Sequence, residues 1–458
     1  MESLCILSAH LLRTACLAAL LFVGACAARG EPDKLALVAL LKNGQFTTLE
    51  SELVPHQQRS EAQPEAEWPV NAAFFAFANS DPTLEPRLNE WIAAMPQSYA
   101  APLARGMFYE HLGWMSRGTA FTGQTPKQRF ADMHRYFELA NIDLQHAIAI
   151  NNRLVPAYVS MVRMARGEGT HEEMQQILKA GLTVAPESLQ LHLAFLDGLN
   201  PIWGGSMAET RAYLKALERE HPKLASLKWF AGYADYAEGR ALFRGEQRFE
   251  DALAHLDRAL SFDDHNAEYR SERAEVLFML DREPEAEATL EPSLADQPQN
   301  TTFLMQMAKI QWYRHRPDEA LATINKALAL DPYDPDYLRL RAQILAGASR
   351  FAEAVRTLDD ALVYGGDDPR MLTERSKDLM YVGRLPEAIE TARRATELAP
   401  DYSRAWLQYA DMLFIGRDCK AKQALRIFRT VCKSDGMCGE EAKSGQAPGI
   451  VMMPCGKA

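Results

Sequence analysis

A small residue recurs every 34 positions through the second half of this sequence. The repeat alanines are Ala252, Ala286, Ala320, Ala354 and Ala388. A second small residue lies twelve positions before each of the last four, at Ala274, Ala308, Ala342 and Ser376. Residues that end a helix or begin a turn lie twelve positions after each, at Asp264, Pro298, Pro332, Gly366 and Pro400. This fixed interval predicts a repeated structural unit.

Each unit has the pattern of two antiparallel helices. An apolar or small residue lies four positions after each repeat alanine, and Ala or Ser lies seven positions after it, which is helical spacing. Small side chains let paired helices approach closely, and one unit alone cannot bury its apolar face, so neighbouring units must stack. We therefore predict an all-α fold, an α-solenoid of antiparallel helix pairs.

The interval and the offsets of the small, large and proline positions resemble the tetratricopeptide repeat (TPR) family. The resemblance implies a TPR-like superhelix over residues 225–435. Its final unit, around Gln423–Leu425, is shifted by two residues near Cys419.

The N-terminal half follows the repeat less closely. Units around Ala140, Met174 and Ala208 assign residues 99–224 to a divergent TPR-like domain, and residues 26–98 are predicted to be helical without the register. The element Pro201–Ser206 has the pattern Pro-x-Trp-Gly-Gly-Ser. It resembles a bacterial helical domain family of unknown function found with TPRs, over roughly residues 33 to 225. This resemblance implies a shared fold and no activity.

The N-terminus predicts export. Arg13 precedes a short apolar run, and small residues follow it, as in a signal peptide over residues 1–25. The segment Val23–Cys26 resembles a bacterial lipobox, in which Cys26 would be lipidated, and plain secretion is the alternative. We expect the periplasm, or a membrane-anchored lipoprotein, of a Gram-negative bacterium.

Cysteine usage agrees with export. Of the seven cysteines, four lie in the last 40 residues: Cys419, Cys432, Cys438 and Cys455. An even, clustered set in an exported chain predicts two disulfides, with three alternative connectivities, which would tie the tail of residues 436–458 to the last helix. Zinc is the rival interpretation, but the paired C-x2-C spacing is missing and no histidine lies nearby, so we predict no metal site.

The sequence contains no motif of an enzyme. H-E-x-x-H, G-x-S-x-G and P-loop patterns are absent, and no cofactor is expected. Gly204–Ser206 is either an anion-binding loop or a turn in which Ser206 caps the next helix and Trp203 packs on a neighbour. An unrecognised enzyme site in residues 33–225 would need convergent polar groups around Glu110, His111, His134 and Trp203.

The resemblance also implies a partner-binding groove on the first helices of the TPR units. Its predicted residues are Met305, Lys309, Trp312, Tyr313, Arg339, Gln343, Arg370, Thr373, Lys377, Tyr381 and Arg404. Basic and aromatic side chains together favour a protein or peptide ligand that is acidic and partly apolar. The alternative is that these are solvated charges on ordinary helix faces.

A net charge of −11 argues against nucleic acid as the main partner. We therefore expect a non-enzymatic scaffold or adaptor, touching the membrane only through an N-terminal lipid. A periplasmic inhibitor or immunity protein against a toxin is the alternative that composition and fold also allow.

Overall fold

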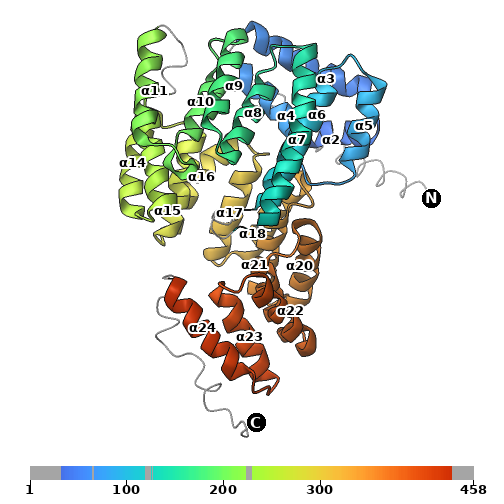
Figure 1. Cartoon of the computed structure of the whole chain (residues 1–458), viewed down its shortest axis with the longest axis vertical. Coiled ribbons are helices and arrows are strands. Elements are labelled where there is room, and N and C mark those ends of the chain that lie inside the picture. Colours follow the sequence, from blue (N-terminus) through green and yellow to red (C-terminus); the bar gives the residue numbers. More distant parts are fainter. Residues whose placement is uncertain (1–31, 64–65, 119–124, 126, 223–229, 436–458) are drawn as a thin grey trace, which may run out of the picture. The chain divides into compact units, whose positions relative to one another are not determined.

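The computed structural model describes residues 32–63, 66–118, 125, 127–222 and 230–435. Every regular element in these ranges is a helix, and consecutive helices pack as antiparallel pairs (Figure 1). The prediction of an all-α solenoid of helix pairs is confirmed. The predicted signal peptide of residues 1–25, Cys26 and the tail of residues 436–458 lie outside the described residues.

The chain divides into two compact units, with the division between Gln299 and Asn300, inside the segment predicted as one array. Unit 1 contains the helices from the N-terminus to α16. These are α2 (Lys34–Lys42), α3 (Phe46–Ala62), α4 (Glu67–Phe74), η2 (Phe75–Phe77), α5 (Leu84–Ala94), α6 (Ala100–Arg117), α7 (Lys127–Ile150), α8 (Val155–Glu168), α9 (His171–Val184), α10 (Leu189–Gly198), η4 (Pro201–Trp203), α11 (Met207–Glu220), α13 (Tyr233–Arg240), η5 (Ala241–Gly245), α14 (Phe249–Phe262), α15 (Ala267–Met279) and α16 (Glu283–Asp296).

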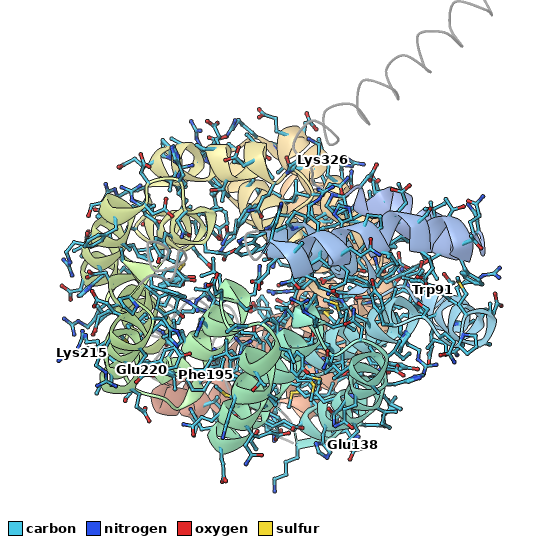
Figure 2. The ribbon with its side chains drawn as sticks, turned by 90° about the horizontal axis from the view of Figure 1, so that it is seen from above. Trp91, Glu138, Phe195, Lys215, Glu220 and Lys326 are labelled. Atoms are coloured by element: carbon cyan, nitrogen blue, oxygen red, sulfur yellow. The ribbon has the colours of Figure 1, made fainter. Side chains whose placement is uncertain are left out.

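Helices α6 and α7 pack closely against each other in unit 1, because two glycines of α6 leave room for side chains of α7. A Cβ at Gly106 would lie 2.8 Å from the Leu144 side chain, and one at Gly113 would lie 2.5 Å from the Phe137 ring. Lys215 and Glu220 of α11 are exposed, whereas Phe195 of α10 is buried (Figure 2).

Unit 2 contains four complete helix pairs. They are α17 (Thr301–Tyr313) with α18 (Pro317–Leu330), α19 (Pro335–Gly347) with α20 (Phe351–Gly365), α21 (Pro369–Tyr381) with α22 (Leu385–Leu398), and α23 (Ser403–Ile415) with α24 (Ala421–Asp435). The repeat alanines Ala320, Ala354 and Ala388 are 0% exposed, and so is Ser376 on the facing helix. The small residues therefore lie where the paired helices meet, as predicted.

The loop inside each pair shows the same period in its backbone. Left-handed φ angles of 55° to 60° occur at Gln247, Asp281, His315, Ser349 and Arg417, and Gly383 has φ 80°. The second helix then begins two residues later in every pair except the last, where α24 begins four residues after Arg417. The two-residue shift predicted near Cys419 is therefore an insertion in this loop.

None of the helices that the structure describes is both long and apolar enough to cross a membrane.

Candidate partner-binding groove

The groove residues lie on α17, α19, α21 and α23, the first helices of the four pairs in unit 2. Tyr313 and Tyr381 are 50% and 53% exposed, and Lys377 and Arg404 are also exposed. Met305, Lys309 and Trp312 are half-buried. The helices thus place aromatic and basic side chains on an accessible surface.

The cation of Arg339 is already neutralised within the chain. Its Nη2 donates to Oε1 of Glu374 at 2.6 Å, and its Nε donates to the same carboxylate. Nε2 of Gln343 donates to Oε1 of Glu374 at 2.8 Å. Arg339 and Gln343 of α19 and Glu374 of α21 therefore form one hydrogen-bonded cluster. The prediction from the sequence had treated Arg339 and Gln343 as residues that bind a ligand.

The cation of Arg370 is engaged as well. Its Nη2 lies 2.7 Å from Oδ2 of Asp368, and this contact is the leading cause that raises the pKa of Arg370. Asp368 also caps α21, because its side chain accepts from the Arg370 backbone N–H. The hydroxyl of Thr373 donates to the carbonyl oxygen of Pro369 within the helix. Lys377 and Arg404 are thus the exposed cations of α21 and α23 in the predicted set.

Aromatic side chains form two platforms at the ends of these helices. Trp312 and Tyr313 meet edge to face with centroids 5.0 Å apart. The Tyr381 ring stacks on Phe351, the first residue of α20, at 4.3 Å and 14°. Between them, a Cβ at Gly347 would lie 2.8 Å from Nε1 of Trp312, so the indole lies across this glycine.

Acidic residues on the same helices were missed. Asp378 is 4% exposed, and burial, followed by the negative charge of Glu374, raises its pKa to about 7. Burial raises the pKa of Asp411 on α23 to about 6. Asp378 lies ten positions before its repeat alanine, where the preceding units have Val276, Ile310 and Ile344. Comparing the units position by position would have exposed this buried acid.

The Pro-x-Trp-Gly-Gly-Ser element of unit 1 has a structural role. The Ser206 hydroxyl accepts from the Glu209 backbone N–H and caps α11. A Cβ at Gly205 would lie 2.2 Å from the carbonyl oxygen of Leu199, so only glycine fits there. Trp203 packs edge to face on Trp114 at 5.9 Å. These contacts favour the capping interpretation over an anion site.

The four residues proposed for an enzyme site do not all have the same surroundings. Glu110 pairs with Arg163 at 3.2 Å, whereas Nε2 of His111 contacts the Ser80 hydroxyl. His134 is exposed on α7 and pairs with Glu168. Glu110 and Trp203 both contact Trp114, whose Nε1 donates to Oε1 of Glu110 at 3.3 Å and whose ring packs on Trp203. His111 and His134 have other partners, so the contacts do not bring the four residues together around one site.

A cavity of about 380 Å³ lies elsewhere in unit 1, between α9, α10 and α11, and none of those four residues lines it. Its floor contains His192, whose Nδ1 lies 2.7 Å from the Tyr213 hydroxyl. Burial lowers the pKa of His192 to about 4, so its ring is neutral and packs as part of the core. Glu220, labelled in Figure 2, also lines this cavity.

Two of the predicted disulfide cysteines lie among the described residues. Cys432 on α24 is buried beside Phe428 and Ala410. Cys419 is exposed in the two-residue insertion before α24. Cys438 and Cys455 lie outside the described residues.

Comparisons with known proteins agree with this geometry. A family model described as a domain of unknown function (DUF4034) matches residues 34–169, which end before Pro201. Two models described as tetratricopeptide repeat match residues 243–310, and residues 305–369 with 373–420. No curated protein is significantly similar in sequence.

Solved structures with similar folds include three bacterial proteins. A thermophilic TPR protein of Thermus thermophilus is 21% identical, with 40% of this chain and 99% of that chain covered and a TM-score of 0.36. A TPR protein from Parabacteroides merdae is 14% identical, with 61% and 97% covered and a TM-score of 0.42. The pilF protein of Pseudomonas aeruginosa is 16% identical, with 48% and 98% covered and a TM-score of 0.39.

The chain therefore carries a DUF4034 domain over residues 34–169 and tetratricopeptide repeats over residues 243–420.

Proposed function

We propose that the protein is a non-enzymatic scaffold that binds a segment of a partner protein along the groove of unit 2. The observation that carries the proposal is the exposure of Tyr313 and Tyr381 on first helices of the TPR units. Tyrosine is enriched among the residues that contribute most to binding at protein interfaces, because its ring supplies apolar contact area while its hydroxyl can remain hydrogen-bonded.

The proposed partner segment is acidic opposite α21 and α23. Lys377 and Arg404 support this part of the proposal, because both are exposed cations on the groove. Arg339 and Arg370 contribute less net charge, since carboxylates of this chain already pair with them. An anionic segment would therefore be steered mainly by Lys377 and Arg404.

Charge reversal of these two cations tests the proposal. The double variant Lys377→Glu, Arg404→Glu is compared with Lys326→Glu, Arg356→Glu, a matched pair that is exposed on the second helices α18 and α20. Affinity purification from the envelope fraction with quantitative mass spectrometry should recover a partner with wild type and the control. The groove variant should recover at least about tenfold less, because two attractive contacts become repulsive.

If the groove variant recovers every partner as well as the wild type does, the proposal is contradicted. Circular dichroism of both variants checks that their helical content is unchanged.

The scaffold is also proposed to be exported and held at a membrane through Cys26. The support is in the sequence, where a short apolar run ends at Val23–Cys26. A Cys26→Ser variant should lose labelling by a fatty-acid probe and move from the membrane to the soluble envelope fraction. Cleavage of both proteins without any lipid label would instead support plain secretion.

Two disulfides are proposed to close the C-terminal end, joining Cys419, Cys432, Cys438 and Cys455 in pairs. The proposal is supported by the state of Cys419 and Cys432, neither of which is a free thiol. Peptide mapping without reduction should find these cysteines linked in pairs. Alkylation of all four before reduction would contradict the proposal, and a stoichiometric zinc content would favour the rival metal site.

A further inference from the structure

The last helix pair, α23 with α24 (Figure 1), departs from a charge pattern that the five pairs before it share. In those pairs, the arginine four positions before the repeat alanine forms an ion pair with the acid one position before it. The N–O distances are 2.5 to 3.0 Å in Arg248–Asp251, Arg282–Glu285, Arg316–Glu319, Arg350–Glu353 and Arg384–Glu387. Ala424 takes the place of the repeat alanine in the last pair, and counting back from it gives Lys420 and Gln423. The acid is thus replaced by a neutral amide, and Lys420 lacks the partner that its equivalents have.

The body of α24 shows a similar exchange of acid for base. Arg393 of α22, five positions after the repeat alanine, pairs with Glu390, two positions after it. The equivalents in α24 are Arg429 and Arg426, so a base takes the place of the acid. The first turns of α14, α16, α18, α20 and α22 each contain at least one acid, whereas the first turn of α24 contains none. The last helix therefore presents cations where the earlier second helices present ion pairs.

Five cations gather at this end of unit 2, and we call them the basic end: Arg417, Lys420, Lys422, Arg426 and Arg429. Four of them are exposed and Lys422 is half-buried. None of the five pairs with a carboxylate in the part of the chain that the structure describes. Asp418, the acid that lies among them in the sequence, accepts from the backbone N–H of Lys420 at 2.9 Å. A concentrated positive surface thus lies on a chain whose net charge is −11.

This arrangement is unfavourable for the helix itself. Lys422, Arg426 and Arg429 follow one another at spacings of four and three residues, so like charges are neighbours on one side of α24. Cations near the start of a helix also oppose its dipole, which favours acids there. A negative group from outside would remove both penalties. The cations are thus arranged to meet an anion and do not stabilise α24.

The surface around the cations favours a membrane over a protein as the source of that anion. Every exposed side chain in the described part of α24 is basic or uncharged and polar, and Leu425 and Phe428 are buried against α23. Protein partners are held mainly by aromatic and apolar anchors, and the described part of α24 exposes none. Anionic phospholipids instead present diffuse negative charge, and clusters of about four to eight Lys or Arg on a helix are typical of proteins that bind them.

We propose that the basic end binds the surface of a membrane that contains anionic phospholipids. Helix α24 lies on the headgroups without inserting, because its apolar side is covered by α23. The inference goes beyond the groove and adds a second membrane contact to the lipid proposed at Cys26. Charges alone hold this contact weakly and reversibly, so it orients an anchored chain and does not retain one that lacks the lipid.

Binding of the full chain to vesicles tests the proposal, with Cys26→Ser in every protein so that no lipid on residue 26 contributes. Co-sedimentation compares vesicles of phosphatidylglycerol and phosphatidylcholine in equal parts with vesicles of phosphatidylcholine alone, at low and at high salt. Arg426→Gln, Arg429→Gln removes two cations of the basic end. Lys326→Gln, Arg356→Gln is the matched control, because it removes the same charge from exposed positions of α18 and α20.

The chain should bind the anionic vesicles more tightly than phosphatidylcholine alone at low salt, and this preference should vanish at high salt. Arg426→Gln, Arg429→Gln should weaken binding about twentyfold, since each basic residue near such a surface contributes about fivefold. The control should bind like the starting protein. Gln423→Glu restores the acid of the earlier pairs beside Lys420 and should weaken binding about fivefold. This change also adds an acid to the first turn of α24, which stabilises the helix, so its loss of binding cannot be ascribed to unfolding.

Four results would overturn the proposal. The first is the absence of any preference for the anionic vesicles, and the second is equal binding by the basic-end variant and the control. Binding of soluble polyglutamate in place of vesicles, lost with Arg426→Gln, Arg429→Gln, would assign the basic end to an acidic protein. Vesicle binding gained only with Glu440→Gln, Glu441→Gln would assign it to the tail of this chain. None of these results bears on the groove or on Cys26, so the proposed function stands or fails separately.

Discussion

The residue between the two helices of each repeat adopts a left-handed backbone, although it is rarely glycine. Among the pairs from α13 to α24, five such positions carry side chains, and Gly383 supplies the residue that suits this conformation without strain. An L-residue in this region costs roughly 1–2 kcal/mol, partly offset because glycine loses more backbone entropy on folding. The loops therefore store a small strain once per repeat.

Exchanging residues at this position should change stability in opposite directions. Ser349→Gly should stabilise unit 2 by about 0.5 kcal/mol by relieving the strain at φ 60°. Gly383→Ala should destabilise it by about 1 kcal/mol, and the backbone is the cause, because no atom lies within 4 Å of an added Cβ. Urea unfolding followed by circular dichroism measures both. Destabilisation by both substitutions would contradict the role of φ.

The raised pKa of Asp378 makes the stability of unit 2 depend on pH. Between about pH 4 and pH 7 the unfolded chain has lost this proton, while the folded chain, with a pKa of about 7, retains it. The unfolded state then binds fewer protons, so the free energy of unfolding falls as pH rises. Glu374 and Lys377 on α21 are the charged groups that act on it: Glu374 raises the pKa of Asp378 and Lys377 lowers it.

Asp378→Asn should remove this dependence, because the amide cannot ionise. The variant should gain stability over the wild type by about 1.4 kcal/mol for each unit from pH 4 to pH 7, and no more above that. Urea unfolding of both proteins at several pH values gives the difference, in which contributions from other acids such as Asp411 cancel. A difference that does not vary with pH would show that Asp378 is ionised when folded.

At the scale of helices, an arginine on the first helix is tied to a threonine on the second in three repeats. Nη1 of Arg273 donates to the Thr289 hydroxyl at 2.6 Å. Arg341 and Arg375 make the equivalent bonds to Thr357 and Thr391, each at 2.9 Å and each across 16 residues. The arginine lies thirteen positions before the repeat alanine and the threonine three after it. This tie fixes the register within a pair.

Thr357→Val should therefore cost about 0.5–1.5 kcal/mol, because the half-buried Arg341 side chain loses this acceptor while the volume of residue 357 is kept. Thr430→Val on α24 is the matched control, since its hydroxyl bonds only to a carbonyl oxygen of its own helix and is exposed. Chemical denaturation compares the two variants. Equal, small losses would mean that the tie contributes nothing beyond the helix itself.

Helix pairs were predictable from the sequence, but pairings between repeats were not. Ala354 and Ser376 identify the contact within a pair because only small side chains fit there, and the interval repeats. The partner of Arg339 is Glu374, 35 residues away, and depends on the register of two first helices in different repeats. Each repeat was interpreted alone, so Arg339 was assigned a free charge. The burial of Asp378 was missed for the same reason.

At the scale of the whole chain, the two units are organised differently. In unit 1 a hydrogen bond joins the start of α2 to Gln299, the last residue of the unit. Oε1 of Gln299 accepts from the Lys34 backbone N–H at 2.9 Å. Residues 265 positions apart are thereby joined. In unit 2 the contacts run between helices that are neighbours or next neighbours in the chain, from α17 to α24. Unit 2 is therefore a linear stack, in which stability is a sum of local terms.

In a linear stack, weakening one interface between helices should reduce the protection of backbone amides from hydrogen exchange only near that interface. Leu358 of α20 is 1% exposed, so Leu358→Ala leaves a cavity that costs roughly 2–5 kcal/mol. Hydrogen exchange measured by mass spectrometry should accelerate most in α19 to α22 and least in α24. Leu425→Ala, which opens a cavity in α24, should produce the reverse gradient, because each repeat passes a disturbance only through its neighbours. Uniform acceleration of unit 2 in both variants would instead require that its four pairs unfold as one cooperative body.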